Sequence, residues 1–197
     1  MKLRLTGGGR CNITNNRDIE EFFDKIVNNK KFLYSALYTF SNYSLLEYFS
    51  NNGLEYKVEL DEKVYTKSDK ADEVIELLRN DLEKNKVKVR YNTMISDLVV
   101  EDETIKGVIT SYGEKILGDK VIITTGGKSF PHTGSDGAMY EILEKHGHTI
   151  TPIHAALIPL VIKEEFVKKL QGVAMRDVVV SAKLKKKKIE KFGDMLF

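Results

Sequence analysis

Three consecutive glycines, Gly7–Gly9, lie near the start of the chain and are followed at once by Arg10, Cys11 and Asn12. Because glycine has no Cβ, this run lets the backbone adopt positive φ angles and come close to a ligand. The first helical pattern begins only at Asp18, so the run lacks the G-x-G-x-x-G arrangement that places a phosphate on a helix N-terminus. A tight structural turn and a ligand-binding turn both fit these residues.

The side chains that follow the glycines each allow two interpretations. The planar guanidinium of Arg10 can pair with a pyrophosphate, or it can form a salt bridge with an acidic side chain. Cys11 fits a small buried packing residue better than a nucleophile, because nucleophilic reactivity requires a lowered thiol pKa. The sequence identifies no catalytic residue.

A second pair of glycines, Gly126 and Gly127, ends the apolar, β-branched run Val121–Thr125. A run that is apolar on both faces is typical of a buried parallel strand. In nucleotide-binding α/β folds, such strands often end at a glycine-rich turn. Two glycine turns in one chain indicate a cofactor held between them.

The composition narrows the class of protein. The 197 residues include 31 Lys and Arg and 29 Asp and Glu, a formal charge of +2, so we expect neither a nucleic acid nor a membrane as partner. Cys11 is the only cysteine, which rules out an internal disulfide and favours a reducing compartment. Residues 1–6 are too few and too charged for a signal peptide, and no apolar run approaches the ~20 residues of a spanning helix. We therefore expect a cytoplasmic protein.

Hydrophobic periodicity predicts a succession of helices and strands. Helices are expected over residues 18–29, 31–40, 44–52, 69–85 and 134–147. Strands are expected over residues 55–59, 63–65, 86–91, 94–101, 104–111, 121–125, 155–162, 173–184 and 189–197. We expect Gly53 to end the third helix, Ser68 or Asp69 to cap the fourth, and residues 101–103 to form a hairpin turn.

The pattern changes near residue 152, between Pro152 and Pro159. We place a domain boundary there, with one domain over residues 1–152 and the β-rich start of another over residues 153–197. Lys185–Lys188 fall between two predicted strands, so we assign them to a hairpin turn whose charge keeps the sheet edge soluble. The four histidines lack the cysteine or carboxylate partners of a ligand set, so we expect no metal.

Several motifs resemble those of one known family. Gly7–Asn15 resembles the signature of a bacterial family of FAD-dependent oxidoreductases that includes aminoacetone-oxidase-like proteins and bile-acid dehydro-reductases. Thr125–Pro131 and Thr133–Gly137 resemble the second signature of that family. Further matches follow in the expected order at Gly147–Ile150 and Ala156–Leu160, with a weaker one at Val64–Val74. The resemblance covers essentially the whole chain.

The resemblance implies a mixed α/β fold. In this family a Rossmann-like FAD-binding domain of the glutathione-reductase type is interrupted by an inserted, mainly β domain. FAD would contact both glycine turns, and Ile95 would hold the adenine through backbone groups. The residues implied to bind FAD are Gly7, Gly8, Gly9, Arg10, Cys11, Asn12, Ile95, Thr125, Gly126 and Gly127.

The chemistry that the resemblance implies is hydride transfer at the flavin, to or from a small organic substrate. NADH and NADPH both fit as electron donor. In the family, a first βαβ unit precedes the Gly7 motif and a closing segment follows the position of Phe197, so we expect this chain to be a fragment. The alternative is a non-catalytic nucleotide- or protein-binding remnant of the same fold. A shared fold leaves the substrate and the oligomeric state open.

Overall fold

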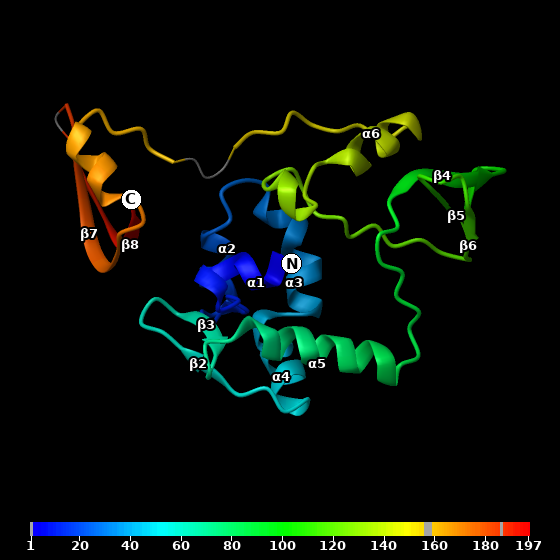
Figure 1. The fold of residues 1–197 in the computed structure, drawn as a ribbon, viewed down its shortest axis with the longest axis horizontal. Helices are drawn as coiled ribbons and strands as arrows, with labels where there is room; N and C mark the ends of the chain where they lie inside the picture. The colour runs from blue at the N-terminus through cyan, green and yellow to red at the C-terminus, as the bar shows by residue number, and fades with distance from the viewer. Residues whose placement is uncertain (1, 156–158, 186) are drawn as a thin grey trace. The chain divides into compact units, whose positions relative to one another are not determined.

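The computed structural model describes residues 2–155, 159–185 and 187–197. The chain is a mixed α/β protein that divides into two compact units, Met1–Ile153 and His154–Phe197. The first unit contains all of the described α-helices, whereas the second is built on a single β-hairpin and a 3-10 turn (Figure 1).

A small antiparallel sheet and two helices form the core of the first unit. The sheet joins β1 (Thr14–Asn15), β3 (Lys63–Thr66) and β2 (Tyr56–Val58) in the order β1-β3-β2. The helices α4 (Asn42–Asn51) and α5 (Ala71–Lys84) pack beside it. The buried cluster consists of Cys11, Phe49, Leu54, Ala71 and Val74.

The other helices are short. They are α1 (Lys2–Leu5), α2 (Ile19–Asp24), α3 (Tyr34–Thr39) and α6 (Ala138–Lys145), with 3-10 turns at Thr6–Gly9, Lys30–Leu33, Pro131–Thr133 and Glu165–Leu170. The helix predicted over residues 18–29 ends already at Asp24, and α1 has no counterpart among the predicted elements. Gly53, with a φ of 85°, follows the end of α4 as predicted.

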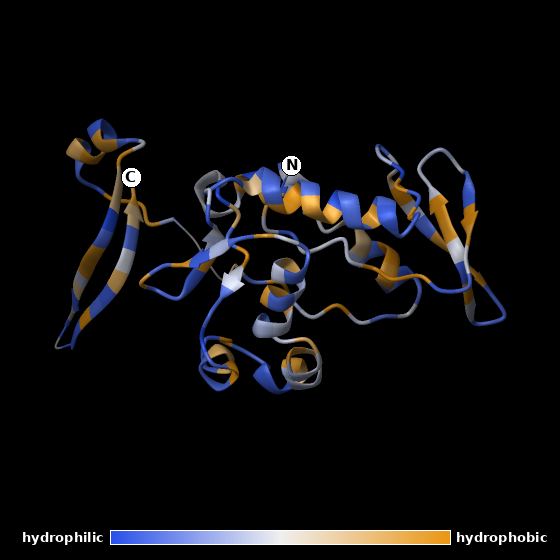
Figure 2. Ribbon diagram, turned by 90° about the horizontal axis from the view of Figure 1, so that it is seen from below, coloured by the Kyte–Doolittle hydropathy of each residue, from blue (hydrophilic) through white to orange (hydrophobic). Residues whose placement is uncertain are grey.

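The longest helix, α5, confirms the periodicity argument but corrects its predicted cap. Hydrophobic and hydrophilic residues alternate along α5 at helical spacing (Figure 2). Neither Ser68 nor Asp69 occupies the N-cap position, which is taken by Lys70. The hydroxyl of Thr66 accepts a hydrogen bond from the Lys70 amide at 2.9 Å, closer than the 3.3 Å of Ser68. A side chain from the preceding strand therefore holds the start of the helix.

A second sheet is an antiparallel meander. It consists of β4 (Ile95–Glu101), β5 (Thr104–Thr110) and β6 (Lys115–Leu117), in chain order. The predicted turn between its first two strands is confirmed, because Asp102 and Glu103 adopt φ angles of 48° and 57°. Two consecutive left-handed residues are the geometry of a tight two-residue hairpin.

Two predicted strands are wrong. Residues 86–91 form no strand, and their apolar side chains are exposed. Val121–Thr125 is also outside every strand, and Ile122 is 87% exposed. A parallel strand buried on both faces needs strands beside it and helices above and below. The described residues form only antiparallel sheets, so they do not build the parallel Rossmann-like sheet that the resemblance implies.

The second unit contains the hairpin of β7 (Ala174–Leu184) and β8 (Lys187–Leu196), as predicted from residues 173–184 and 189–197. Of the strand predicted over residues 155–162, the described part is irregular, and Ala156–Ile158 lies outside the described residues. None of the helices in the described part of the chain is long and apolar enough to cross a lipid bilayer.

Candidate functional site

The first glycine turn is a tight loop that packs against the β1-β3-β2 sheet. Gly7 and Gly8 have φ angles of 59° and 67°, which favour glycine. A Cβ on Gly7 would lie 2.8 Å from Cε1 of Tyr65 and 2.9 Å from the amide nitrogen of Asn12. A Cβ on Gly8 would meet no atom within 4 Å. Packing therefore requires the glycine at position 7, whereas position 8 faces open space.

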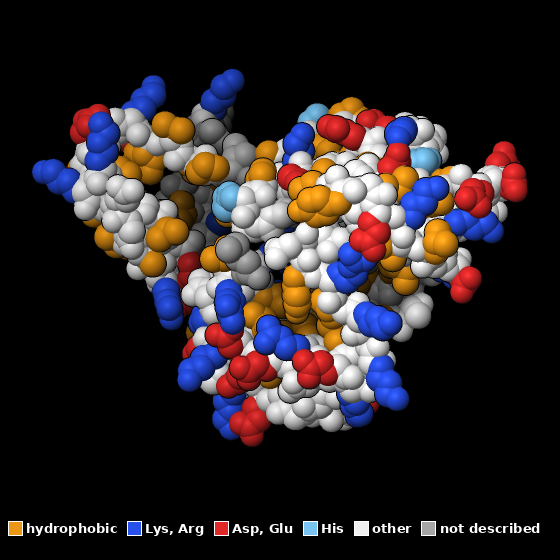
Figure 3. All heavy atoms as spheres, turned by 45° about the vertical axis from the view of Figure 1, so that its right-hand side comes forward, with side chains coloured by type: hydrophobic (Ala, Val, Ile, Leu, Met, Phe, Trp, Pro, Cys, Tyr) orange, Lys and Arg blue, Asp and Glu red, His pale blue; other side chains and the backbone are white. Residues whose placement is uncertain are grey.

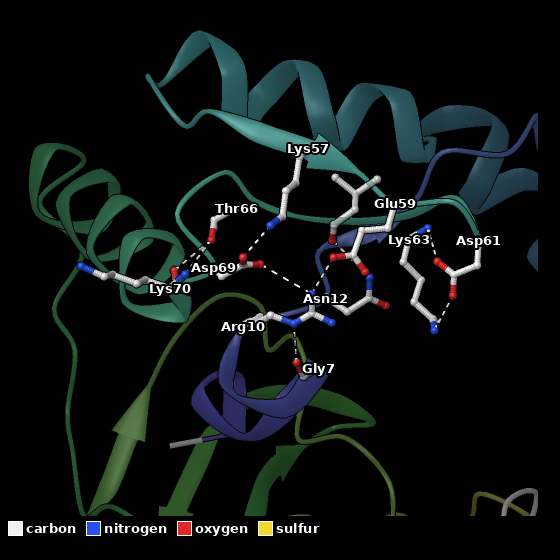
Figure 4. A network of polar contacts seen from close by, with 11 residues as sticks. Gly7, Arg10, Asn12, Lys57, Glu59, Asp61, Lys63, Thr66, Asp69 and Lys70 are labelled. Carbon is white, nitrogen blue, oxygen red and sulfur yellow. Dashed lines mark hydrogen bonds and ion pairs between the residues drawn. The ribbon is translucent and has the colours of Figure 1, made fainter. Parts of the chain in front are cut away.

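Of the two interpretations of Arg10, the structure shows the salt bridge with an acidic side chain. Its Nη1 donates to Oε1 of Glu59 at 2.6 Å, and its Nε donates to the Gly7 carbonyl at 3.3 Å. The guanidinium carbon lies 3.9 Å from the centre of the Tyr65 ring. Figure 4 shows the Arg10 side chain between Glu59 and Gly7. A carboxylate oxygen of Asp69 lies 3.6 Å from Nη1 of Arg10. Burial opposes its charge, but the Glu59 carboxylate raises the pKa of Arg10 overall.

Cys11 and Asn12 also stabilise the fold. Cys11 is 2% exposed within the buried cluster, and this burial raises the pKa of its thiol. Packing rather than nucleophilic reactivity is thus the role that the structure gives it. The Asn12 amide donates to the carbonyls of Thr14 and Val64, at 3.0 and 3.1 Å. The exposed part of the first turn is the backbone of Gly8–Gly9.

The second glycine turn, in contrast, lines an open pocket of about 550 Å³. Thr125 and Gly126 form part of its wall, together with the loop that enters β4 (Asn92–Ile95) and the start of α6 (Gly137–Met139). Pockets of a few hundred Å³ are the size at which proteins enclose small ligands and parts of cofactors.

Glycines keep this pocket open. Gly126, Gly134 and Gly137 have φ angles of 80°, 93° and 79°, so each presents backbone where another residue would place a strained side chain. Ile95 and Met139 add apolar surface beside them. Bare backbone next to apolar side chains suits the flat ring of a nucleotide better than it suits a metal ion, which needs converging charged ligands. Among the residues with described positions, no three His, Cys, Asp or Glu side chains gather as a metal site.

The structure therefore divides the residues implied to bind FAD into two groups. Ile95, Thr125 and Gly126 line one pocket. Gly127 is not among the residues that line the pocket, and its Cβ position lies 3.5 Å from the Tyr140 hydroxyl. The turn Gly7–Asn12 does not line it and packs against the first sheet instead.

The loop before β4 is a part of the pocket that the sequence did not single out. Asn92, Thr93 and Met94 all line the pocket, and Asn92 has a φ of 52°. Asparagine tolerates this left-handed conformation better than most residues. An asparagine two residues before the strand predicted over residues 94–101 was the available signal for a turn at this position.

An ion-pair cluster joins the two elements that form the pocket. The Asp97 carboxylate on β4 bonds to Lys145 Nζ and lies 2.8 Å from His146 Nε2, both at the end of α6. The hydrogen bonds from Lys145 and then His146 hold the pKa of Asp97 well below its usual range. Since β4 and α6 also contribute Ile95 and Ala138 to the pocket, this cluster fixes one wall relative to the other.

Comparison with known families decides the relationship. The family model of the HI0933-like protein Rossmann domain matches residues 1–193. The chain belongs to the HI0933-like family. This confirms the resemblance to FAD-dependent oxidoreductases that include bile-acid reductases.

Curated relatives of the HI0933-like chain are enzymes. It is 34% identical over 174 residues to the 3-dehydro-bile acid delta(4,6)-reductase of Clostridium scindens, covering 87% of this chain and 41% of the relative. It is 28% identical to the ribosomal RNA dihydrouridine synthase of Escherichia coli, covering 91% of this chain and 44% of that protein. The corresponding synthase of Haemophilus influenzae is 25% identical, with 88% and 44% covered. The chain thus spans less than half the length of these relatives.

Proposed function

We propose that this chain forms part of an FAD-dependent reductase that saturates a carbon–carbon double bond conjugated with a carbonyl group. The relatives support this reaction class by their names, since a delta(4,6)-reductase of a 3-dehydro compound and a dihydrouridine synthase both saturate such a bond. The two substrates differ greatly in size and charge. The shared element is the chemistry of the acceptor, which is the part that we carry over to this chain.

The pocket at β4 and the second glycine turn is the observation that carries the proposal. The resemblance implies that Ile95 holds the adenine of FAD, and Ile95, Thr125 and Gly126 line the same pocket. Without a Cβ, Gly126 lets the dinucleotide pass close to the backbone. The residues present therefore fit the adenosine part of FAD.

The first turn would contribute in a different way. Its Arg10 and Asn12 side chains are committed to Glu59 and to backbone carbonyls, so we assign contact with the cofactor to the exposed backbone of Gly8–Gly9. FAD, when bound, supplies the hydride transfer, and NADH or NADPH is the electron donor that we propose. The chain itself orients the cofactor.

A flavin-retention experiment tests the proposal. The purified chain is incubated with excess FAD and desalted, and its visible absorption spectrum is recorded. We expect retained flavin for the wild type and at least about fivefold weaker binding for Gly126→Ala, because a methyl group and a strained φ would enter the pocket. Gly113→Ala is the matched control, because Gly113 has a φ of 81° but lies outside the pocket. Equal losses in both variants would contradict the assignment of the pocket.

The reaction class needs a separate assay. Flavin bound to the protein is reduced without oxygen and mixed with an α,β-unsaturated ketone or with its saturated counterpart. We expect only the unsaturated ketone to reoxidise the flavin. A protein that holds FAD but reacts with neither compound would favour the non-catalytic alternative.

A further inference from the structure

One end of the pocket at β4 is built from two separate segments of the chain. Asn92 and Met94 come from the loop before β4, and Tyr112 comes from the turn between β5 and β6. The Ser111 amide donates a hydrogen bond to the Met94 carbonyl at 2.9 Å. A backbone link therefore joins the loop to the turn at the residue before Tyr112.

An ion pair forms a second link between the same two segments. The two terminal nitrogens of Arg90 donate to the two carboxylate oxygens of Glu114, at 2.9 and 2.7 Å. Bidentate pairs of this kind fix the relative orientation of their side chains. Together with the backbone bond, the pair brackets Asn92 on one segment and Tyr112 on the other. The fold thus holds both residues at the same end of the pocket.

The fold itself makes little use of either side chain. Tyr112 is 86% exposed, and neither its hydroxyl nor the Asn92 carboxamide bonds to any residue with a described position. Apolar side chains reach the surface of the chain between charged ones (Figure 3). Turns favour glycine, asparagine, aspartate or serine, so the β5–β6 turn gives no reason for a tyrosine. An aromatic ring that borders a pocket and is this exposed is available to a ligand.

The charge of the pocket indicates which part of a nucleotide it holds. Among the lining residues that the structure describes, Asp136 carries the only charge. Its carboxylate accepts a hydrogen bond from the Ala138 amide at 3.0 Å, at the start of α6, and so occupies the position that an anion would take. A phosphate group is therefore disfavoured. A neutral, flat base suits the apolar surface of Ile95 and Met139.

We propose that Asn92 and Tyr112 make this pocket selective for adenine. The inference rests on the proposed function, in which the pocket holds the adenosine part of FAD, and it names the side chains that recognise the base. Tyr112 stacks on the ring, as aromatic side chains do with unpaired bases. The Asn92 carboxamide donates to N7 of the base and accepts from its 6-amino group, the pairing that asparagine makes with adenine.

The carboxamide is the group that separates adenine from other purines. Hypoxanthine and guanine carry a carbonyl at position 6, so the carboxamide oxygen meets an acceptor there instead of a donor. Glycine would suit the left-handed φ of 52° at Asn92 equally well. The turn alone therefore does not require the amide, whereas recognition of adenine does.

Nucleoside titrations of the full chain, followed by NMR of the ligand, test this inference. Adenosine and inosine differ only at position 6 of the base, and we expect adenosine to bind at least about fivefold more tightly. In Asn92→Gly this preference should disappear, because glycine keeps the turn and removes the carboxamide. Asn29→Gly is the matched control and should keep the preference, since Asn29 has a φ of 54°, is exposed and lies outside the pocket.

Tyr112 should affect both nucleosides alike, because stacking does not read the edge of the base. We expect Tyr112→Ala to weaken the binding of adenosine and of inosine by at least about fivefold each. Tyr112→Phe should bind like the wild type, since the ring alone stacks. The control Tyr91→Ala removes another ring, 72% exposed and outside the pocket, and should leave both affinities unchanged.

Equal binding of adenosine and inosine to the wild type, or no binding of adenosine, would overturn the inference. An unchanged preference in Asn92→Gly would also overturn it, as would tighter binding of riboflavin than of adenosine. Flavin retention reports separately on the proposed function. A chain that prefers adenosine but retains no FAD would contradict the proposed cofactor and still support the roles of Asn92 and Tyr112. Equal retention of FAD by the wild type, Asn92→Gly and Tyr112→Ala would overturn those roles alone.

Discussion

The two glycine turns of this chain look alike in sequence but occupy different environments. In the first, the Arg10, Cys11 and Asn12 side chains all bond or pack within the first unit, and a Cβ on Gly7 would collide with Tyr65. In the second, Gly126 borders an open pocket and its Cβ position is 3.5 Å from the nearest side chain, that of Ser135. Gly7 and the side chains of the first turn are thus packed against the core, whereas Gly126 in the second turn borders an open pocket.

This difference shows that a glycine motif does not by itself locate a ligand. Glycine permits a left-handed backbone in both turns. What distinguishes them is whether neighbouring side chains fill the space that the absent Cβ leaves. Substitutions at Gly7 and at Gly126 should accordingly change different properties, stability at Gly7 and binding at Gly126.

The largest effect is expected from Gly7→Ala. The left-handed φ costs about 1–2 kcal/mol for an L-residue, and the collision with Tyr65 and the Asn12 amide adds about 1–3 kcal/mol of overpacking. Gly8→Ala shares the φ penalty without the collision. Urea unfolding of both variants at neutral pH should therefore give a clearly larger loss for Gly7→Ala. Equal losses would mean that position 7 is as open as position 8.

A smaller effect is expected from Arg10→Lys. Lysine keeps the charge but loses the bond to the Gly7 carbonyl and the planar contact with the Tyr65 ring. We expect a loss of about 1 kcal/mol in the free energy of unfolding. The control Arg4→Lys changes an exposed pair with Asp72 and should stay within about 0.5 kcal/mol. If both variants behave alike, the Arg10 network contributes no more than a surface ion pair.

The smallest effect is expected from Asp97→Asn, which breaks the link between β4 and α6, and it depends on pH. The bonds from Lys145 and His146 lower the pKa of Asp97 in the folded chain, so they stabilise the fold above the unfolded pKa of about 3.9. This stabilisation is lost as the pH falls through the folded pKa. Asp97→Asn should lower the melting temperature slightly at pH 7, and its difference from the wild type should shrink below about pH 4.

Asp119→Asn is the matched control for that series, because the exposed Asp119 forms no ion pair with any described residue. Its melting temperature should follow the wild type at every pH. If the difference in melting temperature between Asp97→Asn and the wild type stayed constant down to pH 2, the charge of the carboxylate would not contribute to stability. Flavin retention by Asp97→Asn would then report whether the pocket needs the link between β4 and α6.

Local patterns predicted much of this fold. The apolar spacing of residues 69–85 identified α5, and the acidic turn after Glu101 identified the β4–β5 hairpin, because each depends on neighbours in sequence. Val121–Thr125 was misassigned for the opposite reason. Its β-branched residues favour a strand, but a strand forms only where a partner supplies hydrogen bonds, and the described sheets supply none.

The candidate site was predictable in part. The sequence identified both glycine turns, and the family resemblance added Ile95, which does line the same pocket as Thr125 and Gly126. The sequence could not decide between the two interpretations of Arg10, because its partner Glu59 lies 49 residues away and only the β2–β3 hairpin brings Glu59 close to Arg10. The sequence assigned Lys185–Lys188 to a turn, but Lys187 and Lys188 already belong to β8, where Lys188 lies opposite Lys183, because the strand register extends further than the local pattern indicates.

The burial of Cys11 has a practical consequence for studying the molecule. It is the only thiol in the chain, it lies at the centre of the cluster that joins the first turn to α4 and α5, and it is almost completely shielded. A thiol reagent can therefore react only during moments when that cluster opens. The rate at which Cys11 of the unmodified chain is labelled therefore reports how often the core opens, and local unfolding can be measured without introducing a probe.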